Sequence, residues 1–182
     1  MPDYALVLYP QNAGFCLPEK SSLFHELAKI GLLDTDIQGL NHAWYAGPRF
    51  LELITFLGCS PHVVFAPEKQ GGAFTYIEMP DAFDMPRLIS GMNVKTPKCP
   101  GCRQAHVAWQ EWLDEPQGVQ RCEHCGAELS VKIMNWRQSA CLARQLIIIH
   151  EVFEGEAVPG DELLRVLHNI TGTEWDYCYV AY

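Results

Sequence analysis

The sequence lacks any long hydrophobic run and any motif of the common nucleotide-binding or hydrolytic enzymes. Its longest aliphatic stretch, residues 146–149, is far shorter than the roughly 20 apolar residues that a membrane-spanning helix needs. There is no Walker loop, dinucleotide fingerprint, H-E-x-x-H, G-x-S-x-G or kinase signature. These absences exclude a membrane span and leave the familiar enzyme classes without support.

A secretory signal and low-complexity segments are also missing. Residues 1–4 show no basic region followed by an apolar one, so we expect a cytoplasmic protein. With 182 residues, 48% of them hydrophobic and 19% charged, the chain suits one globular domain that carries a small module.

Positive charge is scarce, and the formal net charge is -9. Residues 1–94 carry five basic and ten acidic side chains, and residues 139–182 carry two and seven, whereas residues 95–138 carry six and five. A near-neutral segment therefore interrupts an acidic body. An acidic surface repels phosphate backbones, which argues against general binding of DNA or RNA.

Four of the eight cysteines form two Cys-x-x-Cys pairs, Cys99/Cys102 and Cys122/Cys125, separated by nineteen residues. Each pair predicts a tight turn with both sulfur atoms on one side, and two such turns supply four thiolates to one metal ion. In a reducing compartment this pattern favours a metal site over disulfides.

The spacing resembles that of zinc-ribbon modules over about residues 95–135. The resemblance implies a structural Zn²⁺ held by four cysteines, with iron as the main competitor, and a closed shell that leaves no position for a catalytic water. His106 and His124 lie near the pairs but are more often surface residues than ligands.

The residue after each pair carries a further prediction. Glycine usually follows the second cysteine because the turn there is left-handed, and Gly126 fits this rule. Arg103 departs from it. Either Gly101 compensates within the first turn, or Arg103 places its positive charge near the thiolates.

Outside the cysteine segment, hydrophobic periodicity predicts an α+β domain with a mixed or antiparallel sheet and helices on one face. We expect one discontinuous body, residues 1–94 and 139–182, and a zinc-ribbon insert, residues 95–138, which we call the cysteine module. Residues 34–47 are expected to be irregular, and the last strand–helix–strand unit to set two strands parallel. The expected strands are 4–9, 62–66, 74–79, 146–153 and 175–180, and the expected helices are 23–30, 48–57 and 161–171.

Within the cysteine module, residues 105–112, 119 onward and 129–134 are expected to be strands around almost no core. Trp109 and Trp112 would then face opposite sides of one strand. Either these rings and Trp136 cover the thin core and its junction with the body, or one side is a docking surface.

Three functions follow as hypotheses. The first is protein recognition, as an adaptor, through the tryptophans of the cysteine module. The second is nucleic-acid binding through its basic residues, with bases stacked on tryptophan. The basic residues are Lys95, Lys98, Arg103, Arg121, Lys132 and Arg137.

The third hypothesis is an enzyme with a pocket in the body. Cys59 and His62 could pair as nucleophile and base, although Cys59 follows a predicted helix C-terminus, where the helix dipole disfavours a thiolate. His42 and Arg49 belong to a polar, aromatic loop that could line a pocket. His150 and His168 are expected to be structural or exposed, without a catalytic triad.

Overall fold

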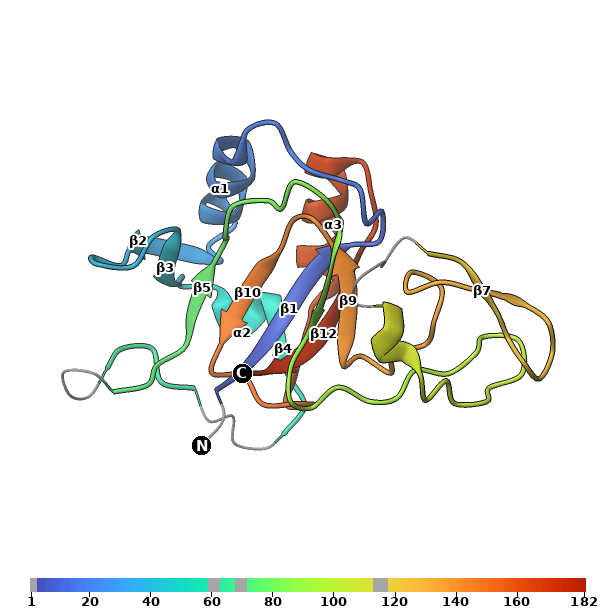
Figure 1. Cartoon of the computed structure of the whole chain (residues 1–182). Helices are drawn as coiled ribbons and strands as arrows, with labels where there is room; N and C mark the ends of the chain where they lie inside the picture. The colour runs from blue at the N-terminus through green and yellow to red at the C-terminus, as the bar shows by residue number, and fades with distance from the viewer. Residues whose placement is uncertain (1–2, 59–62, 68–71, 113–117) are drawn as a thin grey trace.

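A computed structural model describes residues 3–58, 63–67, 72–112 and 118–182. It confirms an α+β protein built on a six-stranded antiparallel sheet, with three helices and smaller sheets (Figure 1). The helices are α1 (Lys20–Lys29), α2 (Phe50–Leu53) and α3 (Asp161–Thr171). The strands are β1 (Tyr4–Pro10), β2 (Leu33–Asp36), β3 (Ala43–Ala46), β4 (Ile54–Phe56), β5 (Tyr76–Glu78), β6 (Arg87–Ser90), β7 (Gln120–Arg121), β8 (Glu128–Leu129), β9 (Ala140–Ala143), β10 (Ile147–His150), β11 (Ala157–Pro159) and β12 (Trp175–Ala181).

The main sheet has the strand order β12-β1-β10-β5-β3-β2, and β1 lies buried between β12 and β10. Both β10 and β12 pair with β1 in antiparallel fashion. The two strands are therefore parallel to each other, as expected, and β1 lies between them. Strand β10, helix α3 and strand β12 thus form a split β-α-β arrangement with β1 between the two strands.

Successive residues of β1 point to opposite faces of the sheet and so contribute to two different cores. Leu6 and Leu8 pack with α1, α2 and α3, in a cluster that includes Leu27 and Leu167. The predicted placement of the helices on one face is thus confirmed, because their apolar stripes meet this side of the sheet.

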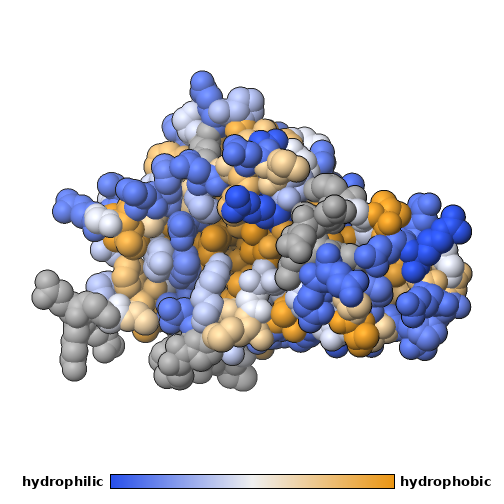
Figure 2. Space-filling model, in the orientation of Figure 1, coloured by the Kyte–Doolittle hydropathy of each residue, from blue (hydrophilic) through white to orange (hydrophobic). Residues whose placement is uncertain are grey.

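Ala5 and Val7 pack on the other face of the sheet. A two-stranded ribbon of β6 and β9 covers β1 and β12 there, through Ile89, Cys141 and Ala143. In Figure 1, β9 lies in front of the sheet and α2 behind it. Figure 2 shows hydrophobic side chains gathered over the middle of this face.

Several local expectations are wrong because partners distant in sequence decide the structure. Residues 34–47 contain β2 and β3, which pair with each other, and β3 also pairs with β5. The expected helix 48–57 is only α2, since the next three residues, β-branched or aromatic, form β4 against β11. Strands β6 and β9 were not foreseen.

Of the expected strands 62–66 and 74–79, the described residues form only β5, and one bond joins the two segments, from the Thr75 amide to the Val64 carbonyl at 2.7 Å. His62 lies outside the described residues. The helix before Gly172 and the closing strand are confirmed, and Gly172 ends α3 in the left-handed conformation (φ 67°).

Candidate metal centre

The two cysteine pairs lie on two turns that share one hydrogen-bond pattern. The Cys99 amide donates to the Gln104 carbonyl (2.9 Å), and the Arg103 amide donates to the Cys99 carbonyl (2.9 Å). The second turn repeats both bonds at the same spacing. There, the Cys122 amide donates to Ala127 and the Gly126 amide donates to Cys122, each at 2.8 Å. Each pair is thus a knuckle, closed by the backbone alone.

Arg103 adopts the left-handed conformation itself, with φ of 63°, beside 72° for Gly126. Gly101 is not left-handed, so it does not replace Arg103 in the turn, and the placement of the Arg103 charge near the thiolates stays a prediction. An L-residue in this region is strained by roughly 1–2 kcal/mol, so the first knuckle is held in place against a local preference.

The sulfur atoms of Cys99, Cys102, Cys122 and Cys125 lie within 4.8 Å of one another. Two distances across the knuckles, Cys99 to Cys125 and Cys102 to Cys122, are both 3.7 Å. A tetrahedral zinc ion with Zn–S bonds of about 2.3 Å requires sulfur atoms roughly 3.8 Å apart. The four side chains thus fit a metal ion, and they are the sole such cluster within the described parts of the chain.

Backbone N–H groups surround the sulfur atoms and favour the charged thiolates. Donation from the Cys125 and His124 amides lowers the pKa of Cys122 to about 6. The Gln104 amide also favours the Cys102 thiolate, but burial and the neighbouring thiols outweigh it and raise the pKa of Cys102 to about 12. Four thiols so close together share protons as a unit, and a bound cation would displace the remaining ones.

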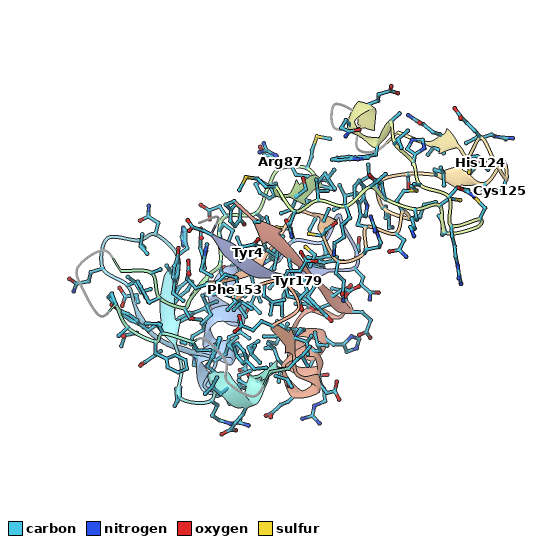
Figure 3. The ribbon with its side chains drawn as sticks, turned by 90° about the horizontal axis from the view of Figure 1, so that it is seen from below. Tyr4, Arg87, His124, Cys125, Phe153 and Tyr179 are labelled. Carbon is cyan, nitrogen blue, oxygen red and sulfur yellow. The ribbon has the colours of Figure 1, made fainter. Side chains whose placement is uncertain are left out.

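His106 and His124 are not part of the four-sulfur cluster. His124 is exposed, and Figure 3 places it with Cys125 at the far end of the cysteine module. Neither imidazole belongs to the cluster, and His124 contributes to it through its backbone amide, which donates to Cys122.

The cysteine module has a core, contrary to the expectation of almost none. Trp109 is 7% exposed and packs edge-to-face on Trp136, with ring centroids 5.3 Å apart. The Trp136 indole donates to the Val131 carbonyl at 2.8 Å. The cluster continues into the body through Ala140 and Leu142 of β9.

Two expected strands of the module are wrong. Residues 105–112 make one bridge at Ala105 and then a 3₁₀ helix, Trp109–Trp112, because Trp109 turns inward to the core. Of residues 129–134, only Leu129 belongs to a strand, β8, and a turn follows it. The strand-like pairing expected there occurs one residue later, as a bridge between Asn135 and Lys98. The side chain of Trp112 is outside the described parts of the chain.

Hydrogen bonds of Asn93 and Gln138 join the two ends of the cysteine segment to β12, and we call this connection the neck. Asn93 donates to the Tyr179 carbonyl (3.0 Å) and accepts from the Ala181 amide (2.9 Å), while the Tyr179 amide donates to the Gln138 carbonyl (2.9 Å). Lys95 forms an ion pair with Glu154 of the body. The chain just before the cysteine module and the last residue of the module are therefore both bonded to β12.

The proposed enzyme residues do not form a site among the described residues. Arg49 forms ion pairs with Glu52 (2.7 Å) and Glu162 (2.9 Å), which join α2 to α3. His42 lies 3.6 Å from Asp81 on the surface. Cys59 and His62 lie outside the described residues.

The two other histidines also have local partners. His150 binds the Glu78 carboxylate at 2.8 Å and stacks on Tyr76, with centroids 4.2 Å apart. His168 lies 3.1 Å from Glu174. Pairing of His150 and Glu78 could not be inferred from the sequence, because it depends on the contact of β10 with β5.

Comparison with protein-family models, curated proteins and solved structures finds no match to this chain. Of the described helices, none is both long and apolar enough to cross a membrane.

Proposed function

We propose that Cys99, Cys102, Cys122 and Cys125 bind one structural Zn²⁺, and that the cysteine module so formed binds another protein. The observation that carries the metal assignment is the four-sulfur cluster with its 3.7 Å separations. A shell of four thiolates leaves no open position, so the ion stabilises the fold and takes no part in chemistry. Because thiolates need reducing conditions, we place the protein in the cytoplasm.

Iron fits the same sulfur cage and is the runner-up metal. Elemental analysis of the purified protein separates the two, and we expect one zinc per chain. A colourless protein that loses zinc in Cys122→Ser and keeps it in Cys16→Ser supports the assignment, since Cys16 lies outside the cluster. Stoichiometric iron, or the absence of any metal, would contradict it.

The position of the cysteine module favours a role as an adaptor. It extends away from the body, with Cys125 near its far end (Figures 1 and 3). Val107 and Val119 are 77% and 65% exposed although they lie in a segment with its own buried core. Exposed apolar residues on a projecting, fixed element are typical of a protein contact. Burial of Trp109 removes that ring from the expected docking surface.

Nucleic-acid binding receives less support from the same geometry. Trp109 and Trp136 are buried against each other, so neither ring offers a free face on which a base could stack. Lys95 is neutralised by Glu154. Arg103 and Arg121 remain exposed, and a titration with single-stranded oligonucleotides at two salt concentrations is the direct check on them.

Protein binding is tested by affinity capture with the pair of changes Val107→Asp and Val119→Asp. We expect partners of the wild-type protein to be lost while the zinc content stays at one per chain. Leu40→Asp is the matched control, because Leu40 is an exposed apolar residue outside the cysteine module. Partners that persist in the double variant, or that disappear equally with the control, would refute the role.

A further inference from the structure

A groove of about 500 Å³ lies on the body, beside α2. Its described lining comes from Asp34 of β2, the Ala46–Gly47–Pro48 turn, residues 50–52 of α2, and Phe65. The turn is part of the loop whose composition suggested a pocket. Helix α2, beside which the groove lies, is on the opposite side of the sheet from β9 (Figure 1).

The groove has an apolar floor and an apolar rim. Phe50 forms the floor, is 1% exposed, and receives the edge of the Phe65 ring at 5.9 Å between centroids. Leu51 and Phe65 on the rim are 51% and 41% exposed. Large apolar side chains left open beside a preformed hollow are a common feature of binding sites.

Charge limits what can occupy the groove. The charged residues in its described lining are Asp34 and Glu52, both negative. Arg49, the nearest cation on the same turn, is already shared by Glu52 and Glu162. With a net charge of -9 on the whole chain, a cationic occupant is favoured over an anionic one.

The size and openness of the rim favour a peptide over a small molecule. A drug-sized ligand usually buries most of its surface in an enclosed pocket, whereas this groove is open at a rim where Leu51 and Phe65 are exposed. We propose that this groove binds a peptide segment of a partner protein that carries large apolar side chains next to lysine or arginine. The apolar side chains contact Phe50, Leu51 and Phe65, and the cation lies beside Asp34, because Glu52 already pairs with Arg49. This contact is separate from the one proposed for the cysteine module.

The test is fluorescence anisotropy with short, capped, dye-labelled peptides. The probe contains adjacent phenylalanine and leucine flanked by lysines, and two analogues replace either the lysines with glutamates or the apolar pair with alanines. We expect saturable binding of the probe that weakens as salt rises, and no saturable binding of either analogue.

Three variants complete the test. Leu51→Ser should weaken binding about tenfold, because it removes a buried apolar contact. Asp34→Asn should weaken binding about threefold and reduce the salt dependence. Leu40→Ser, which changes a comparably exposed leucine outside the groove (46%), should leave binding unchanged.

Several outcomes would overturn the proposal. These are no saturable binding of the probe, equal binding of the glutamate analogue, or equal losses in Leu51→Ser and Leu40→Ser. Phenethylamine that binds as tightly as the peptide would also overturn it, since the groove would then be a small-molecule pocket. Because both leucines are exposed, far-UV circular dichroism of the variants should match that of the wild type.

Discussion

Removal of the metal should unfold the knuckles and leave the main sheet intact. Structural zinc contributes on the order of 10 kcal/mol to the folding of small modules, and a whole domain is stable by only about 5–15 kcal/mol. The four backbone bonds of the knuckles join residues within six positions of each other around the thiolates. Without the ion, the two knuckles lose the sulfur–metal bonds that join them, so these backbone bonds should open.

Amide hydrogen exchange measures the protection of each backbone N–H and so tests the knuckles and the main sheet separately. In Cys122→Ser, or after chelation, the amides of Cys99, Arg103 and Gly126 should lose protection by several orders of magnitude, as expected for bonds that depend on the ion. Amides in the β1–β12 ladder, which pairs seven residues from Tyr4↔Ala181 to Pro10↔Trp175, should keep theirs. Strand β9 should show an intermediate loss, because Ala140 and Leu142 belong to the same apolar cluster as Trp109.

The control is Cys16→Ser, which leaves the four-sulfur cluster complete. Knuckle amides that stay protected without metal would show that the apolar cluster around Trp109 and Trp136 suffices. Equal loss of protection in the β1–β12 ladder would show that the body also depends on the metal. Either result would refute the reasoning.

Four further substitutions test the cysteine module and its neck. Arg103→Gly should stabilise the protein by about 1 kcal/mol and Gly126→Ala should destabilise it by a similar amount, since both positions are left-handed; melting temperatures at fixed zinc check the pair. Trp109→Ala should destabilise the module by about 3–5 kcal/mol, because the ring is buried, and urea unfolding would contradict this if the midpoint were unchanged. In the folded protein, the bond from Lys95 lowers the pKa of Glu154, so this ion pair stabilises the fold above the unfolded pKa of about 4.3 and the effect is lost as pH falls through the folded value. Glu154→Gln should therefore cost under about 1 kcal/mol at pH 7 and progressively less as the pH falls below about 4.3, and a difference that grows toward low pH would exclude the mechanism.

The local sequence pattern predicted the structure of segments that are specified by their own residues. Helix α3 was predictable because Leu163, Leu167 and Gly172 mark its buried face and its end. The gathering of the four cysteines was predictable because each knuckle closes through bonds within six residues. Prediction failed at β3 and β4, whose pairing with β5 and β11 depends on residues far along the chain.

The candidate binding surfaces also depend partly on local sequence and partly on contacts between distant segments. The sequence predicts Trp109 on a strand, one side of which could serve for docking. In the structure the Trp109 ring packs on Trp136 in the core of the cysteine module. The groove beside α2 could be anticipated only in its Gly47–Pro48 turn, since Phe65 and Asp34 reach it from other segments. Exposure of a side chain depends on what packs over it, and that partner is not adjacent in the sequence.

The sequence by itself determined the α+β class, the acidic charge and the gathering of Cys99, Cys102, Cys122 and Cys125, because composition, periodicity and short-range turns set these properties. Tertiary structure alone decided that β1 separates β10 from β12, that the cysteine module shares its core with β9, and that its neck is fixed to β12. Those features arise from packing and hydrogen bonds between segments dozens of residues apart, whose energies depend on the whole fold rather than on any local stretch.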